Sequence, residues 1–135
     1  MGVLLAIVLP TFCILGLRAR VGASATGDGA AVSGLPPDAT DVHWFLPGAF
    51  GPNTVYEFKT TEAGYQQWVQ NRRDGDLEGP TRGAFRVLRY DDATADFAWR
   101  DLKNTIAYTW NEEDRGLYMV YDLDGGRAYY WWHSR

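Results

Sequence analysis

Residues that carry common catalytic and redox chemistry are scarce in this sequence. Cysteine occurs once, at Cys13, so the chain after it contains neither a disulfide nor a thiol nucleophile. The three serines are Ser24, Ser33 and Ser134, and none of them stands in a G-x-S-x-G motif. No glycine-rich phosphate-binding motif is present either. The sequence therefore argues against thiol, serine hydrolase and phosphate-loop chemistry.

Potential metal ligands are equally sparse. His43 and His133 are the only histidines, and neither has a histidine partner at the i+2 or i+4 position. The run Asp122-x-Asp124-Gly125-Gly126 is similar to the start of a calcium loop, but it lacks the later ligands and the closing glutamate. We therefore predict no metal and no cofactor, and expect each histidine to be a hydrogen-bonded residue of a sheet.

Basic residues are outnumbered by acidic ones. The chain has 13 Lys and Arg against 17 Asp and Glu, a formal net charge of −4. Without residues 1–25 the balance is 11 against 17, a charge of −6. The arginines between positions 72 and 89 are interleaved with carboxylates, which is typical of a solvated surface of mixed charge. A nucleic-acid partner is not expected, because phosphate contacts require a basic surface.

Long apolar runs are missing except at the start of the chain. Residues 3–17 carry no charge, and Arg18 and Arg20 follow them directly. Such a run indicates an export signal or a membrane anchor. Fifteen residues with Pro10 among them are short for a membrane-spanning helix, which needs about 20. Ala23-Ser24-Ala25 also matches the small-residue pattern of a signal cleavage site.

Two fates of this segment stay open. Against cleavage, the segment before the apolar run has no Lys or Arg, and the arginines follow the run. Under the positive-inside tendency, Arg18 and Arg20 would hold the C-terminal side in the cytoplasm, so the cleaved and the retained fates stay equally open. We expect residues 1–25 to be a signal peptide or a membrane anchor, with residues 1–20 in contact with the membrane if they are retained. A buried N-terminal helix is the alternative. The first two fates place the rest of the chain outside the cytoplasm or at a membrane surface, and we expect an exported or anchored protein with its domain outside the cytoplasm.

The remaining chain divides into a tether and one domain. Residues 22–34 consist almost wholly of Gly, Ala, Ser and Thr, and residues 35–40 form a proline-rich entry. We predict that residues 26–40 are a flexible tether, because this composition buries little apolar surface. Residues 41–135 are long enough for one hydrophobic core and are predicted to be a single domain.

Periodicity within the domain predicts strands around one helix. Residues Tyr65, Trp68 and Val69 recur at helical spacing behind the candidate caps Thr60 and Thr61. Strands are predicted over residues 42–46, 55–59, 84–90, 105–111, 117–123 and 127–133, while residues 97–100 are either a short strand or a loop. The pattern predicts an α+β fold, a meandering antiparallel sheet of about five or six strands with one helix packed on one face.

Aromatic residues are concentrated in the last strand. Side chains alternate along a strand, so Tyr129, Trp131 and His133 share one face. Neighbouring strands add further aromatics at Tyr108, Trp110, Tyr118 and Tyr121. An exposed face of this kind suits a saccharide or an envelope protein, and Tyr129, Trp131 and His133 are the predicted contact residues. Cross-strand pairs that only stabilise the sheet are the alternative, as is a contact between copies of the chain.

Two other functional classes stay open. Glu112, Glu113 or Asp122 beside His133 would supply the carboxylate and base of a small hydrolase, if the fold brought them into one pocket. An exposed sheet edge would instead suit an inhibitor or an assembly partner. The acidic residues 112–114 are more typical of a solvated hairpin turn. The sequence therefore favours a protein that acts without catalysis, and we assign it no catalytic residue.

The order of several short motifs resembles a group of small exported bacterial proteins of uncharacterised function. The motifs are Leu35-Pro36-Pro37-Asp38-Ala39-Thr40, Tyr56-Glu57-Phe58, and an ending with Tyr121-Asp122 and Gly126-Arg127-Ala128-Tyr129-Tyr130. The resemblance implies a leader followed by one α+β domain, and it implies no activity. Together with the residue patterns it predicts an exported or membrane-tethered binding module of the cell envelope.

Overall fold

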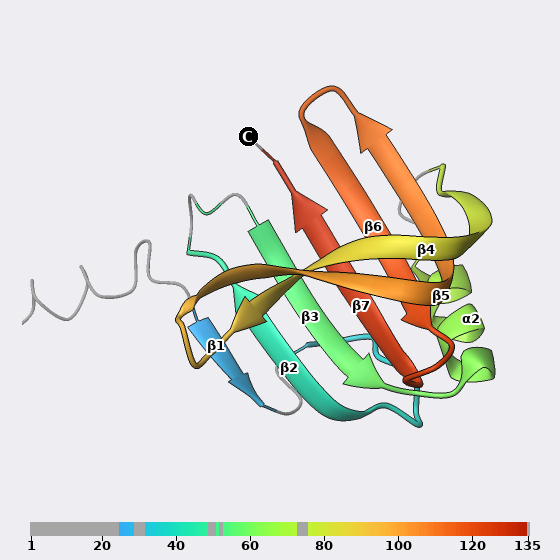
Figure 1. Ribbon diagram of the computed structural model, residues 1–135, viewed down its shortest axis with the longest axis horizontal. Helices are drawn as coiled ribbons and strands as arrows, with labels where there is room; N and C mark the ends of the chain where they lie inside the picture. Colours follow the sequence, from blue (N-terminus) through green and yellow to red (C-terminus); the bar gives the residue numbers. More distant parts are fainter. Residues whose placement is uncertain (1–24, 29–31, 49–50, 52, 73–75, 135) are drawn as a thin grey trace, which may run out of the picture.

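The computed structural model describes residues 25–28, 32–48, 51, 53–72 and 76–134. These residues form one antiparallel sheet of seven strands and one helix, α2 (Figure 1). The strands are β1 (Ala25–Asp28), β2 (Thr40–Leu46), β3 (Asn53–Lys59), β4 (Glu78–Asp91), β5 (Asp96–Glu112), β6 (Arg115–Asp122) and β7 (Arg127–His133), and α2 spans Glu62–Asn71. The predicted sheet-dominated antiparallel fold is therefore confirmed for the described residues.

The sheet consists of two meanders joined at their centre. Its strand order is β1-β2-β3-β7-β6-β5-β4, so each meander connects strands that follow one another in the sequence. The last strand, β7, pairs with β3 over seven residues, from Asn53 opposite His133 to Lys59 opposite Arg127. This pairing joins the N-terminal meander to the C-terminal meander at the middle of the sheet.

The first strand lies in the segment that the sequence predicts to be a tether. Ala25–Asp28 pair with β2, from Ala25 opposite Leu46 to Asp28 opposite His43. The ladder uses main-chain groups, so a sequence of small residues without an alternating apolar pattern can still add an edge strand. Residues 25–28 therefore differ from the predicted tether, while the other six strands fall at the predicted domain.

The helix begins at a cap that a distant segment supports. Thr61 is the N-cap residue, and its hydroxyl accepts a hydrogen bond from the Gly64 N–H at 3.0 Å. The Asp38 carboxylate accepts bonds from the Thr61 N–H at 3.0 Å and from the Thr61 hydroxyl at 2.7 Å. It also accepts one from the Thr60 hydroxyl at 2.7 Å. Asp38 thereby fastens the proline-rich entry to the start of α2.

The apolar stripe of α2 belongs to the larger part of the core. Tyr65, Trp68 and Val69 are buried, as their spacing predicts. The Tyr65 hydroxyl lies 3.1 Å from the Ile106 carbonyl oxygen and 2.8 Å from that of Met119, which ties the helix to two strands. The sheet contributes further buried side chains to the same cluster, namely Tyr56, Phe58, Ile106, Leu117, Met119, Tyr121 and Ala128.

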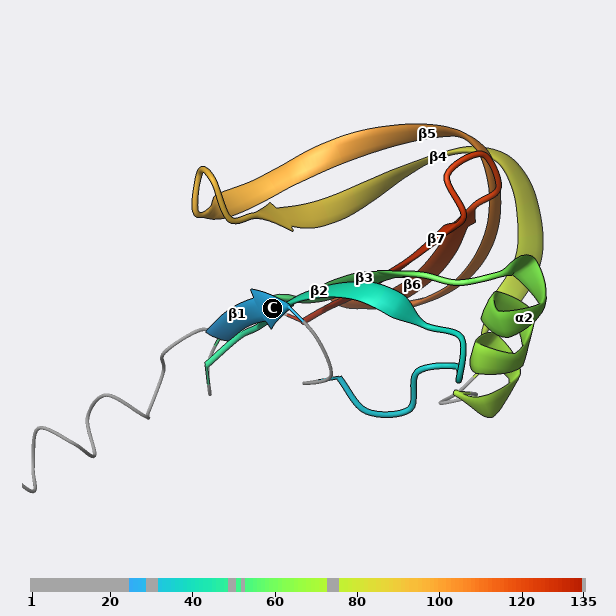
Figure 2. The same ribbon diagram turned by 90° about the horizontal axis from the view of Figure 1, so that it is seen from below.

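One face of the sheet is covered by the β4–β5 hairpin. The two strands pair from Glu78 opposite Thr109 out to Asp91 opposite Asp96, whereas β5 pairs with β6 only from Thr105 onward. The outer part of the hairpin therefore leaves the sheet, and Figure 2 shows it arching back across the face away from α2. Residues 97–100, whose structure the sequence leaves open, belong to this part of β5.

A bulge marks the bend of the hairpin. The register shifts between Gly83 and Phe85, and Gly83 has a φ of +128°, in a region that side chains disfavour. Beyond the bend, Leu88 packs with Phe45 and Val55 of the sheet. Gly79 and Pro80, a pair typical of loops, lie at the start of β4. Because of the bulge, the first part of the hairpin forms the edge of the sheet and the outer part covers a face of the sheet.

The predicted leader lies almost wholly outside the described residues. These residues begin at Ala25, so the apolar run and its arginines are not among them. Within the described part of the chain, no helix combines the length and apolar character needed to cross a bilayer.

Candidate binding cleft under the β4–β5 hairpin

Two rows of side chains cross the sheet face that the hairpin covers. His43, Glu57 and Tyr129 lie opposite one another on β2, β3 and β7 and form the first row. Phe45, Val55 and Trp131 form the second row, two residues along each strand. The first row is polar at its β2 and β3 positions, and the second is apolar. The hairpin therefore spans a boundary between a charged and an aromatic part of the same face.

A cleft of about 410 Å³ opens between the hairpin and the charged row. This volume falls within the range of roughly 300–1,000 Å³ that is typical of small-molecule sites. Its lining comes from both layers: His43 and Glu57 from the sheet, and Arg89, Tyr90, Asp91, Asp92, Ala98, Trp99 and Arg100 from the hairpin. The cleft is thus formed by segments that the bend at Gly83 brings together.

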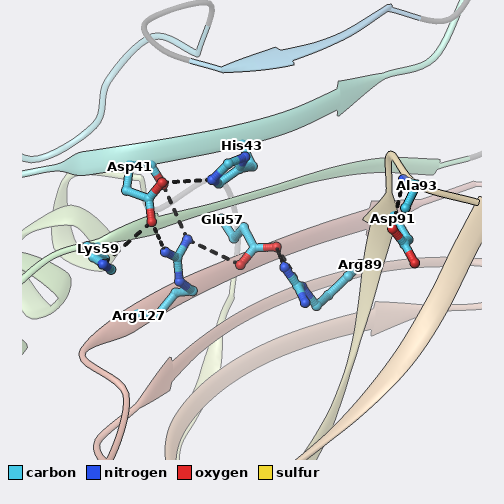
Figure 3. Close-up of polar contacts among 8 residues, drawn as sticks. All are labelled: Asp41, His43, Glu57, Lys59, Arg89, Asp91, Ala93 and Arg127. Atoms are coloured by element: carbon cyan, nitrogen blue, oxygen red, sulfur yellow. Dashed lines mark hydrogen bonds and ion pairs between the residues drawn. The ribbon is translucent and has the colours of Figure 1, made fainter. Parts of the chain in front are cut away.

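Glu57 is the buried charge of the cleft. The residue is only 5% exposed, and its Oε1 atom lies 2.6 Å from Arg89 Nε and 2.5 Å from Arg89 Nη2. Its Oε2 atom lies 3.2 Å from Arg127 Nη1 (Figure 3). Two guanidinium groups thus compensate the cost of removing this carboxylate from water. Because Arg89 belongs to β4, the ion pair also fixes the hairpin over the sheet.

The charged network continues along β2 through Asp41. This carboxylate is 2.8 Å from His43 Nε2 and 3.7 Å from Lys59 Nζ, and it accepts a hydrogen bond from Arg127 (Figure 3). The hydrogen bond with His43, and then that with Arg127, lowers the pKa of Asp41 from its ordinary value. Glu57 and Asp41 therefore share Arg127, so the base of the cleft is held by connected ion pairs.

Trp99 stands at the mouth of the cleft. It is 51% exposed, and it is the one large apolar side chain among the described residues that is so open to solvent. Its ring meets Trp131 edge-on, with centroids 5.2 Å apart and planes at 84°. The Arg86 guanidinium lies 5.8 Å from the Trp99 ring centroid. The contacts with Trp131 and Arg86 thus hold the indole ring in place, while about half of the side chain stays exposed to solvent.

The three aromatic residues predicted from the last strand lie on this same face. Tyr129 is 3% exposed and lies beneath the hairpin, where its hydroxyl has no hydrogen-bond partner among the described residues. Burial, and then the charge of Glu57, raises the pKa of Tyr129. Trp131 is half-buried, and its ring stacks on that of Tyr118 with centroids 4.6 Å apart. The centroid of the His133 ring lies 5.0 Å from that of Trp131. Tyr129 is therefore buried under the hairpin, and Trp131 packs between His133 and the Trp99 ring.

Asp122 and Glu112 of the alternative hydrolase lie apart from His133. His133 is opposite Gly116 on β6, and Asp122 is six residues further along that strand, roughly 20 Å away. Glu112 shares an ion pair with Arg115 at 2.8 Å, and the strand alternation puts it on the other sheet face from His133. No group of three metal-ligating side chains occurs among the described residues.

Sequence reasoning missed the hairpin side of the site. Arg89 was predicted to belong to a solvated surface of mixed charge, and the segment with Trp99 and Arg100 had no firm assignment. The alternation of side chains along the strand does indicate that Glu57 points to the other face of the sheet from Tyr56 and Phe58, away from the helix. Its partners could not be inferred, because they are 32 and 70 positions away in the chain and meet it only through the bend.

Comparison with known proteins adds no relationship. No family model matches the chain, and no curated protein and no solved structure matches it. The chemistry of the cleft therefore has to be read from its own residues.

Proposed function

We propose that this protein is a non-catalytic binding module and that its ligand occupies the cleft under the β4–β5 hairpin. The observation that carries the proposal is Trp99, whose half-exposed indole borders a cleft of about 410 Å³. Exposed tryptophan is unfavourable in water, and a flat indole beside polar groups is typical of sites for saccharides and peptides. The buried ion pairs of Glu57 keep the cleft preformed, so little ordering opposes binding.

The arrangement supports binding better than catalysis. The charged groups at the base of the cleft are occupied by one another: Glu57 with Arg89 and Arg127, and Asp41 with His43. A general base or nucleophile needs a lone pair directed at the substrate. These side chains instead stabilise the position of the hairpin, and the groups left for a ligand lie on β4 and β5.

We further propose an α+β description and a location outside the cytoplasm. The first is supported by α2, whose stripe of Tyr65, Trp68 and Val69 belongs to a core cluster with sheet residues on the face away from the hairpin (Figure 2). The second is supported by the uncharged run over residues 3–17 and by the Ala23-Ser24-Ala25 motif. The ligand is then expected among compounds of the cell envelope.

Replacement of Trp99 tests the proposed function. Intrinsic fluorescence and calorimetry should detect binding of at least one member of a panel of soluble envelope oligosaccharides and short peptides. The Trp99→Ala variant should lose that binding while its unfolding midpoint changes little, because the side chain is half in solvent. Trp110→Phe, which changes an indole outside the cleft lining, is the control. Absence of binding across the panel, or equal binding by Trp99→Ala, would refute the proposal.

A further inference from the structure

The hairpin wall of the cleft carries opposite charges at its two ends. Asp91 lies opposite Asp96 beside the hairpin turn, and Asp92 follows it. Arg100 lies opposite Val87, four positions further from the turn on either strand. Asp91, Asp92 and Arg100 all line the cleft. A strand rises about 3.3 Å per residue, so the two charged ends are separated by roughly 13 Å along the ribbon.

These end groups are available to a ligand. Arg100 and Asp92 make no ion pair with any of the described residues, and the Asp91 carboxylate accepts a bond only from the Ala93 N–H, at 2.9 Å. The charges at the base differ, because Glu57 already contacts Arg89 and Arg127. A ligand in the cleft therefore meets unneutralised negative charge near the turn and unneutralised positive charge near Arg100.

The middle of the same wall carries no unpaired charge. Between the two ends the cleft is lined by Tyr90, Ala98 and Trp99 and by Arg89, which lies opposite Ala98 and is already paired with Glu57. An acid, then a stretch without unpaired charge, then a base matches a molecule with a cationic and an anionic end and small uncharged groups between them. A neutral saccharide has no charges to satisfy the two ends, and a free amino acid is too short to reach both.

We infer that the cleft binds a short extended peptide of about four residues through its two free ends. Its ammonium group pairs with Asp91 and Asp92, its carboxylate pairs with Arg100, and its small side chains contact Trp99. Four extended residues span about 13–14 Å, which equals the separation of the charged ends. The inference rests on the proposed function, since it names the ligand class of the same cleft.

Calorimetric titration of the full chain with tetra-alanine tests this assignment. Tetra-alanine should bind, and both N-acetyl-tetra-alanine and tetra-alaninamide should bind more weakly, by up to about fivefold. An accessible ion pair contributes up to about that factor. Higher salt should weaken tetra-alanine more than either blocked peptide, because salt screens the pairs with exposed side chains.

A charge variant tests the contact at the carboxylate end of the peptide. Arg100→Gln should weaken tetra-alanine by the same factor as amidation, and it should bind tetra-alanine and tetra-alaninamide equally. Arg82→Gln is the matched control: Arg82 is an exposed arginine of the same hairpin, it pairs with Glu62 at 3.8 Å, and it does not line the cleft. This control should bind all the peptides as the unaltered protein does.

The outcomes separate this inference from the proposed function. Equal binding of blocked and free peptides, or unchanged binding by Arg100→Gln, overturns the inference about the peptide ends. Binding of an oligosaccharide but not of tetra-alanine, lost in Trp99→Ala, also overturns it and leaves the proposed function intact. If neither class binds in a manner that depends on Trp99, both proposals fail.

Discussion

Replacement of Gly64 by alanine should destabilise the protein, although alanine is the better helix former. Gly64 lies in the first turn of α2, where alanine would ordinarily add up to about 1 kcal/mol to the free energy of unfolding. An added Cβ would however lie 2.4 Å from Asp38 Oδ1 and 2.4 Å from Thr60 Oγ1. Both atoms belong to the contacts that fasten the chain before β2 to the helix.

The size of the effect follows from the bonds that must move. The Asp38 carboxylate accepts three hydrogen bonds, from Thr60 and from the N–H and hydroxyl of Thr61. Exposed bonds of this kind contribute about 0.5–1 kcal/mol each, so their loss costs roughly 2–3 kcal/mol. Subtracting the gain in helix propensity leaves a net loss of about 1–2 kcal/mol in the free energy of unfolding.

A double-mutant cycle in urea measures this coupling. In an Asp38→Ala background the Thr60 hydroxyl has lost its partner and can turn away, so Gly64→Ala should become neutral or stabilising there. The interaction free energy between the two sites should therefore be at least about 1 kcal/mol. If Gly64→Ala stabilises both backgrounds to the same degree, the contact between Asp38 and the first turn does not constrain Gly64 and the reasoning is wrong.

Two further predictions concern charged groups. Glu57→Gln should lower the free energy of unfolding by about 2 kcal/mol, because Arg89 and Arg127 lose their shared anion. Glu62→Gln should change it little, because the one ion pair of Glu62 with a described residue is an exposed 3.8 Å contact. Equal effects of the two variants in chemical denaturation would contradict the role of Glu57. The hydrogen bond from Thr60, and then those from Thr61, lower the pKa of Asp38 in the folded protein. The contribution of Asp38 to the free energy of unfolding is therefore complete above the ordinary pKa of 3.8 and is lost as the pH falls through the lower folded value. The stability of the Asp38→Asn variant should fall less steeply below pH about 4 in an acid titration. Identical profiles for the two proteins would exclude this linkage.

Local patterns were enough to predict the helix and most of the sheet. The stripe of Tyr65, Trp68 and Val69 specifies α2, because its period differs from that of a strand. Alternation and the Asp124-Gly125-Gly126 turn specify the last hairpin, and β7 has the predicted bounds, Arg127–His133. These elements depend on neighbours in the sequence, so a local reading is sufficient.

The cleft depends on contacts that no local pattern encodes. The bend at Gly83 decides whether residues 85–102 continue the sheet or return over it, and many glycines in strands cause no such bend. Only after the return does Arg89 meet Glu57 and Trp99 meet Trp131. The aromatic alternation of β7 indicates the face that the hairpin covers, and on that face Tyr129 is buried beneath the hairpin rather than exposed.

The return of the hairpin also protects the protein against self-association. In an open sheet the outer edge of β4 would offer main-chain groups along 14 residues to any other strand, a common route to aggregates. Figure 2 shows β4 lying between β5 and the main sheet in the returning part, so that edge is turned toward the chain's own sheet. In its first part Pro80 removes an N–H donor. The opposite edge of the described sheet is β1, which is only four residues long. The bend that forms the cleft thus leaves a sheet with little edge for another copy to extend.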